Sequence, residues 1–282
     1  LPADTHLLDW LEEKGIPYDT VTDWELHHEG TDLLKPYKAV TTCSHPEYHT
    51  AETLDALTEY RDSGGKLMYL GGNGFYWRVA LHPEKDGIIE VRRAEDGIRA
   101  WAAEPGEYYH AFDGEYGGLW RRNGRPPQAL CGLGFSSQGK FQGTYYSRRP
   151  GADKLETNWI FQGVPDRVIG DFGLSGGGAA GFELDRADHR LGTPPNAVIL
   201  ATSESPQNHF KLVPEEMLTN DTTIPGDSHE ELVRADMIYF DCPGGGAVFS
   251  VGSITFCGSL SHDNYDNNIS RIMENVIRRF TA

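Results

Sequence analysis

Two short stretches of the sequence place several reactive side chains directly after predicted strands. The first is His45-Pro46-Glu47-Tyr48-His49, in which four of five residues carry functional side chains. Pro46 disfavours helix at His45 and stiffens the turn. The stretch could hold a ligand or act as a general-base cluster, or it could be a surface loop with two exposed histidines and a helix-capping Glu. Its place at a strand end favours the first interpretation.

The second stretch runs from Gly72 to Trp77 and reads GNGFYW. Its glycines allow a left-handed backbone or the close approach of another segment. We expect Phe75 and Trp77 to pack in the core, and Tyr76 between them to turn toward the site, where a buried hydroxyl needs a partner. The alternative is a tight turn that serves packing alone.

A third unusual stretch, GGGAAGFELDR over residues 176–186, begins with six small residues. Because so little side-chain bulk is present, we expect this backbone to run close to another element. Glu183 then follows as a carboxylate delivered into the pocket. In the alternative interpretation, Glu183 and Asp185 pair with Arg186 or cap a turn.

Standard catalytic signatures are absent from the sequence. There is no GxSxG, HExxH, GxxxxGK[ST] or GxGxxG between a strand and a helix. Gly71-Gly72-Asn73-Gly74 occupies the place of a nucleophile elbow, yet it contains neither Ser nor Cys. If the site is hydrolytic, a metal-bound water is therefore the expected nucleophile.

The elements that must position these residues follow from apolar periodicity. It predicts helices over 4–14, 51–63 and 267–280, and strands over 18–22, 37–43, 66–70, 197–202, 236–241 and 247–252. Alternation of helix and strand in the first quarter predicts a doubly wound, mostly parallel α/β sheet, with its ligand site at the carboxyl ends of the strands. A first strand is expected upstream of the first helix. Residues 85–175, with strand-like pieces at 88–92 and 159–161, are predicted to form an insertion of hairpins and loops over the sheet edge, a lid.

Composition narrows the class of protein. The chain has 282 residues, 42 acidic against 25 basic, and a formal net charge of -17. This balance argues against nucleic acid, which requires clustered Lys and Arg. No window approaches the apolar length of a membrane span. The four cysteines are far apart without metal-ligand spacing, so reduced thiols and a cytoplasmic location are expected. We expect one domain over 1–282, belonging to a longer chain.

Several motif strings together resemble one known family. HPEY after a strand, YLGGNGFYW, GLWR at Gly118–Arg121, GDFGLSGGGAAGFELDR and GGGAVFSVGS are similar to the C-terminal domain of the large (beta) subunit of N,N-dimethylformamidase. The resemblance covers nearly the whole chain. It implies a class I glutamine amidotransferase-like, flavodoxin-like fold without the amidotransferase Cys. It also implies a mononuclear Fe(III), held by two tyrosines and one carboxylate, that serves hydrolysis of the C–N bond of small N-substituted formamides.

The resemblance further implies a small subunit, an upstream β-rich domain and an oligomer. Within it, Tyr48 and Tyr76 are our choices for the two phenolates, because both follow neighbouring strands, and Glu183 is our choice for the carboxylate. Glu156 is the fallback. Three hard, anionic oxygen ligands favour Fe(III) and leave positions for water and the substrate carbonyl.

The same resemblance suggests roles for the remaining polar residues of the two loops. His45, Glu47 or His49 would shuttle a proton to the departing amine, and Asn73 would orient the substrate carbonyl or the water. The chief rival is a non-catalytic amidotransferase-like domain that binds carbohydrate or a partner chain through its aromatic residues. A third possibility is an enzyme of the same fold that acts on a different small amide or ester.

Overall fold

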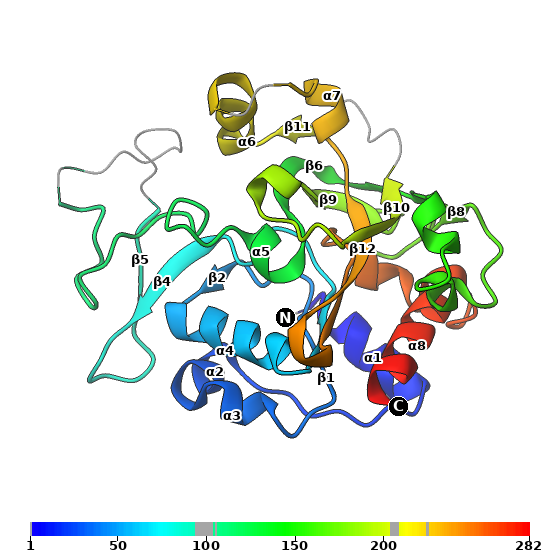
Figure 1. The fold of residues 1–282 in the computed structure, drawn as a ribbon, viewed down its shortest axis with the longest axis horizontal. Helices are drawn as coiled ribbons and strands as arrows, with labels where there is room; N and C mark the ends of the chain where they lie inside the picture. Colours follow the sequence, from blue (N-terminus) through cyan, green and yellow to red (C-terminus); the bar gives the residue numbers. More distant parts are fainter. Residues whose placement is uncertain (1, 94–103, 105, 204–208, 224–225) are drawn as a thin grey trace.

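A mixed seven-stranded sheet forms the centre of the computed structural model, which describes residues 2–282 except 94–103, 105, 204–208 and 224–225 (Figure 1). The strand order is β1-β3-β13-β12-β10-β7-β8. The bounds in that order are Ala39–Thr41, Lys66–Tyr69, Ala247–Ser250, Asp236–Asp241, Val198–Ser203, Tyr146–Arg148 and Val168–Ile169.

Strand direction divides this sheet into two halves. β1, β3 and β13 are parallel to one another, whereas the four pairings from β13 through β12, β10 and β7 to β8 are antiparallel. The expectation of a mostly parallel sheet is therefore wrong for this half. Only Cys242–Gly246 separate β12 from β13, and a parallel crossover needs a dozen or more residues, so these strands must form a hairpin.

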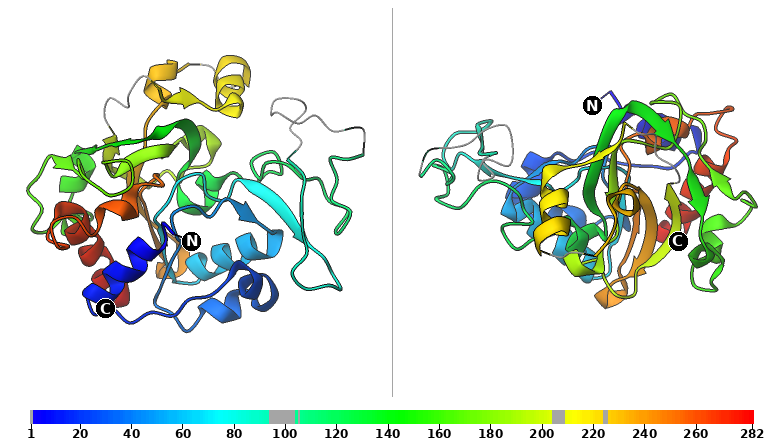
Figure 2. Two further views of the ribbon diagram at one scale, coloured as in Figure 1. Left: turned by 180° about the vertical axis from the view of Figure 1, so that it is seen from behind. Right: turned by 90° about the horizontal axis from the view of Figure 1, so that it is seen from above.

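Helices cover both faces of the sheet, as a doubly wound pattern requires. On one face, α1 (Thr5–Glu13) and α8 (Asn268–Thr281) lie side by side, joined by a hydrogen bond from Trp10 Nε1 to Ser270 Oγ of 2.9 Å (Figures 1 and 2). On the other face lie α2 (Asp23–Glu29), α3 (Thr31–Leu34) and α4 (Ala51–Asp62). Successive side chains of a strand point to opposite faces of the sheet. Along β3, Met68 therefore packs on the face covered by α1 and α8, and Leu67 packs on the face covered by α2, α3 and α4.

Two three-stranded sheets and several short helices complete the described chain. One sheet has the order β11-β6-β9, over Lys211–Leu212, Gly134–Thr144 and Ala180–Arg186; the other has the order β2-β4-β5, over Tyr48–His49, Trp77–Leu81 and Ile89–Val91. The short helices are α5 (Pro127–Cys131), α6 (Pro214–Leu218) and α7 (His229–Leu232), with 3-10 turns over Pro150–Asp153, Asn158–Phe161, His189–Leu191, Pro243–Gly245 and Phe256–Ser259, and a π-helical turn over Thr219–Thr223. None of the helices in the described ranges combines the length and apolarity that a membrane crossing requires.

Most predicted elements lie within two or three residues of their observed bounds, but three expectations need correction. Residues 18–22 have no regular secondary structure and join no sheet, and 159–161 belong to a 3-10 turn rather than a strand. The segment 85–175 is not simply a lid, because β7 and β8 complete the central sheet. Part of the predicted lid, 94–103 and 105, lies outside the described residues.

Candidate active site

The loops that follow β1 and β3 meet at one edge of the central sheet, because these neighbouring strands are parallel and end together. Backbone hydrogen bonds join the loops directly. The Gly72 N–H donates to the Ser44 carbonyl at 3.2 Å, and the Phe75 N–H donates to the Pro46 carbonyl at 2.7 Å. The two motifs singled out in the sequence are therefore neighbours in space, and their backbones hold each other.

A third element, β9, anchors the loop that follows β3. Asp185 on β9 accepts hydrogen bonds from the Asn73 N–H at 2.8 Å and from the Tyr69 hydroxyl at 2.7 Å, and Tyr69 in turn accepts from the Gly74 N–H at 2.7 Å. Asn73 and Phe75 both have positive φ, of 52° and 54°. Such backbone is unfavourable for residues other than Gly, so the fully buried Asp185 and its partners stabilise a strained turn.

Four side chains converge above this turn, and we call them the His45 group: His45, Glu47, Asn73 and Glu183. His45 Nε2 lies 3.3 Å from Glu47 Oε2, 3.2 Å from Glu183 Oε2 and 3.4 Å from Asn73 Nδ2. Gln138 on β6 donates to Glu183 Oε1 at 3.1 Å. One imidazole thus sits between two carboxylates that come from different elements.

Burial and like charges shift the protonation of this group. Burial alone would lower the pKa of His45, but the hydrogen bond and charge of Glu183, with the charge of Glu47, raise it above its ordinary value. Burial and the Glu183 charge raise the pKa of Glu47. Burial chiefly raises the pKa of Asp185 to about 7, with the Glu183 charge adding to it. Such shifts cluster at sites that transfer protons.

One buried oxygen of the group, Asn73 Oδ1, has no hydrogen-bond partner in the described part of the chain. A second, Glu183 Oε2, is paired with protonated His45, whose Nε2 lies 3.2 Å away. Both residues are almost completely buried, at 3% and 6% exposure. Buried acceptors without a donor cost free energy, and at a functional site they mark positions that a ligand satisfies.

The two tyrosines chosen as metal ligands lie in one aromatic cluster beside the His45 group. Tyr76 packs edge-on against Trp77 and Phe135, and Tyr48 packs against the same cluster. Trp77 connects the two regions, because its indole N–H donates to Glu47 Oε1 at 3.1 Å. Tyr48 pairs with Trp77 across β2 and β4, so Tyr76 is the sequence neighbour of its partner, and the two tyrosines come from adjoining segments of the chain.

Two predicted residues do not join the group. His49 is buried with Nε2 3.0 Å from the Pro46 carbonyl and Nδ1 3.2 Å from Thr53 Oγ1, and its ring packs on Phe75. Because both ring nitrogens have protein partners, His49 serves the packing of the turn. Glu156, the fallback carboxylate, is exposed between two 3-10 turns near the far end of the sheet.

Sequence reasoning missed three contributors: Tyr69, Asp185 as a turn anchor, and Gln138. The alternative interpretation had Asp185 pair with Arg186 or cap a turn; Arg186 instead contacts Glu216 and Asp188 at 2.7 Å each, whereas Asp185 accepts a hydrogen bond from the Asn73 N–H of the turn. Alternation places Glu183 and Asp185 on the same face of β9, which was the available signal. The expected close backbone approach is present, since a Cβ at Gly178 would lie 2.4 Å from the Thr144 carbonyl oxygen.

The donor set limits which cation the site suits. Among the described residues, no group of three or more His, Cys, Asp and Glu side chains is arranged to hold a metal ion. A metal here would therefore need the phenols of the aromatic cluster as well as a carboxylate. Glu183, a buried carboxylate whose Oε2 lies 3.2 Å from His45 Nε2, fits such a carboxylate by its chemistry.

Fold and group together define an α/β protein with a cluster of one imidazole, one amide and two carboxylates at the carboxyl ends of its parallel strands. A family model described as "N,N-dimethylformamidase beta subunit-like, C-terminal" matches residues 1–268, and the chain belongs to this family. It is 45% identical over 281 residues to a protein named N,N-dimethylformamidase beta subunit from Paracoccus aminophilus, and 44% identical over 281 residues to one of the same name from Alcaligenes sp.. Each match covers 99% of this chain and 37% of the relative.

Proposed function

We propose that this chain forms the catalytic domain of an amidohydrolase that cleaves the C–N bond of small N-substituted formamides such as N,N-dimethylformamide. Two relatives named as dimethylformamidase beta subunits, similar over 99% of this chain, support the reaction class. The observation that carries the proposal is the His45 imidazole between two carboxylates, with raised pKa values at His45 and Glu47. Amide hydrolysis needs such a proton donor, because an amine is a poor leaving group until it is protonated.

We further propose a mononuclear Fe(III) as the cofactor. Tyr48, Tyr76 and Glu183 would hold it, since they offer two phenolates and one carboxylate on adjoining parts of the site. Bound there, the cation would polarise the amide carbonyl and lower the pKa of a water molecule, which supplies a nucleophile at neutral pH.

Side chains of the His45 group would then transfer the proton that the departing amine needs. His45, held as imidazolium by the charges of Glu183 and Glu47, is placed to donate from Nε2 to the departing amine. Trp77 fixes Glu47 through its indole N–H. Asn73 would orient substrate through its unsatisfied Oδ1, and Asp185 with Tyr69 would keep Asn73 in its left-handed conformation.

Metal content and turnover, measured separately, test this proposal. The purified chain, alone and coexpressed with the small subunit that the family resemblance implies, would be assayed for iron and for formate release from N,N-dimethylformamide. We expect about one iron per chain and a visible absorption band from tyrosinate bound to Fe(III). Tyr48→Phe and Tyr76→Phe should lose both the iron and the band.

Tyr146→Phe is the matched control, because Tyr146 is a buried phenol on β7 whose hydroxyl donates to the Val251 carbonyl, away from the aromatic cluster. It should retain iron and colour. Iron retention in both Tyr48→Phe and Tyr76→Phe would reject the ligand assignment. Iron-free protein with full turnover would reject the cofactor, and absence of any amide hydrolysis would reject the reaction.

Carbohydrate binding, the rival function, gains little support from the fold. Trp10, Trp77 and Trp120 are completely or almost completely buried, so these indoles cannot stack on a sugar. A small subunit, a β-rich domain and an oligomer remain part of the proposal, supported by the relatives' names as subunits and by the 37% of their length that this chain spans.

A further inference from the structure

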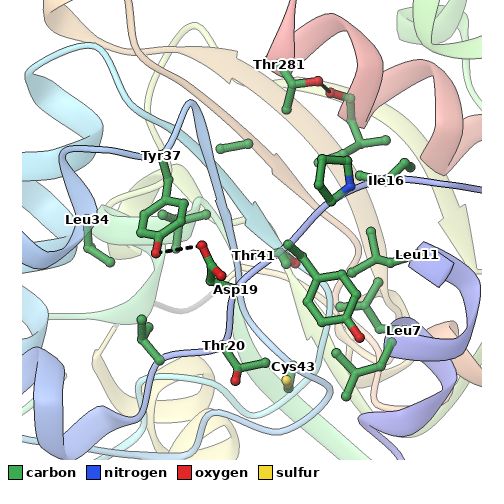
Figure 3. A pocket seen from close by; sticks show the side chains of 17 residues that line it. Leu7, Leu11, Ile16, Asp19, Thr20, Leu34, Tyr37, Thr41, Cys43 and Thr281 are labelled. Carbon is green, nitrogen blue, oxygen red and sulfur yellow. Dashed lines mark hydrogen bonds between the residues drawn. The ribbon is translucent and has the colours of Figure 1, made fainter.

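A slot unrelated to the His45 group lies at the other side of β1. It is an open apolar cavity of about 220 Å³, walled by residues 16–21 on one side and by β1 on the other (Figure 3). Leu7 and Leu11 of α1 and Ile277 of α8 line it, and all three side chains belong to the main hydrophobic core. The slot is thus a gap in the core layer beside the central sheet.

The wall formed by β1 is an edge of the sheet that no strand of the described ranges covers. The Thr42 N–H donates to the Met68 carbonyl of β3 at 2.9 Å. Because backbone groups alternate in direction along a strand, the N–H and C=O groups of Ala39 and Thr41 point the other way, toward the slot. Apolar side chains and a row of outward backbone groups form a template for strand addition.

The order of elements along the chain also indicates that a strand is missing beside β1. In the flavodoxin-like order 2-1-3-4-5, the first strand lies between the second and the third. Here residues 16–22, which have no regular secondary structure, follow α1 in the place of a second strand, β1 follows α2 and α3 as the third, and β3 follows α4 as the fourth. The slot between 16–22 and β1 is the position of the first strand.

We propose that this slot receives an apolar β-strand of about five residues, contributed from outside residues 1–282 and running parallel to β1. A parallel strand would end at the carboxyl end of β1, where Asp4 Oδ1 accepts hydrogen bonds from the N–H and hydroxyl of Ser44 at 3.1 and 2.9 Å. A short link then leads into α1. The curated relatives have ample chain for such a strand, since this chain spans 37% of their length.

Cys43, an exposed residue at the slot, provides the probe for a direct test. Cys131 and Cys257 are buried, so Cys242→Ser leaves Cys43 as the accessible thiol. We would join the strand Val-Ile-Val-Val-Val to Leu1 through a short Gly-Ser linker and compare it with the same extension carrying Pro at its centre. We expect at least about tenfold slower alkylation of Cys43, and slower hydrogen exchange at the Thr41 amide, only with the Pro-free strand. Equal rates with both extensions would overturn the proposal.

A second variant distinguishes strand pairing from mere covering. Thr41→Pro removes an outward N–H without touching the β3 pairing, so the unextended chain should keep its melting temperature while the extended chain regains alkylation within about twofold of the unextended rate. Retained protection in a folded Thr41→Pro variant would reject pairing. Protection that rises with protein concentration, or a bound apolar molecule in native mass spectra, would assign the slot to a second copy or a small ligand instead. The test does not depend on amidase activity.

Discussion

Two carboxyl groups three residues apart, Asp185 and Asp188, have opposite electrostatic surroundings. Asp185 is completely buried with neutral donors and a neighbouring carboxylate, and burial raises its pKa to about 7. Burial would also raise the pKa of Asp188, but hydrogen bonds from Arg190 and Arg186 lower it far below its usual range. The first belongs to the site beside His45, and the second to a network of ion pairs.

The difference separates a region arranged for chemistry from one arranged for stability. Acidic side chains gathered around a single imidazole destabilise the fold, and proteins tolerate this where function requires it. In the Arg186 network each buried carboxylate instead meets guanidinium groups, as Glu216 does between Arg186 and Arg121. Variants at the site should therefore change turnover more than stability, and variants in the network should do the reverse.

Glu183→Gln should give the largest effect. The amide keeps the shape and the hydrogen bond with Gln138, but removes the charge that stabilises the His45 imidazolium and the proposed cation. We expect turnover to fall about 10³-fold or more with little loss of stability. Formate release and urea unfolding check the two parts.

Glu274→Gln is the control for this variant, because Glu274 on α8 is a half-buried carboxylate that pairs with Arg278, Arg271 and Lys14, none of which belongs to the His45 group. Its turnover should remain within about twofold of the original chain. A similar, small loss in Glu183→Gln would place the chemistry elsewhere.

Arg186→Met should show the opposite behaviour. After this change Glu216, which is 1% exposed, is still paired with Arg121, and Asp188 is still paired with Arg190. We expect the free energy of unfolding to fall by about 3 kcal/mol, at the low end for a broken buried pair because these partners remain. Turnover per folded molecule should stay unchanged, and a large fall in it would show that the network also supports the site.

The parallel half of the sheet could be predicted from the sequence, because each strand there is a buried apolar run that is followed by polar loop residues. β1 and β3, and the loops that carry His45 and Asn73, follow from that pattern. The antiparallel half did not follow, because strand direction depends on connections such as Cys242–Gly246 and on long-range pairing that periodicity does not encode.

Side-chain roles were harder to predict than elements. His49 has the same residue type and motif as His45, yet its ring turns into the packing of Phe75. Asp185 carries no local mark of its bonds to Tyr69 and Asn73, which lie 116 and 112 residues away in sequence. Such partners are fixed only when three elements meet.

His45→Gln should lower turnover about 10²-fold, an ordinary value for loss of one proton donor. Because the charge of Glu183 raises the pKa of His45 above 6.5, the imidazolium is present below that raised value and is lost as pH increases through it. Turnover of the original chain should therefore decline on the alkaline side, and the His45→Gln variant should lack this decline. His49→Gln, at a ring that only packs, should retain the decline, and its absence there would transfer the proton-donor role to His49.

Asp185→Asn should give the smallest but most diagnostic effect. An Asn amide nitrogen must face either the Tyr69 hydroxyl or the Asn73 N–H, so one hydrogen bond is lost at a cost of about 1–3 kcal/mol at pH 5. The raised pKa of Asp185 means that its stabilisation is fully present below about pH 4 and declines as pH rises toward about 7, whereas Asn does not titrate. The loss in the free energy of unfolding that the variant shows in urea should therefore become smaller between pH 5 and pH 8.

Asp188→Asn, at a carboxyl with lowered pKa, should instead lose most stability at neutral pH and approach the original chain as pH falls below about 4. Parallel pH profiles for the two variants would mean that Asp185 is ionised and paired like Asp188, and the electrostatic contrast between the two regions would be lost.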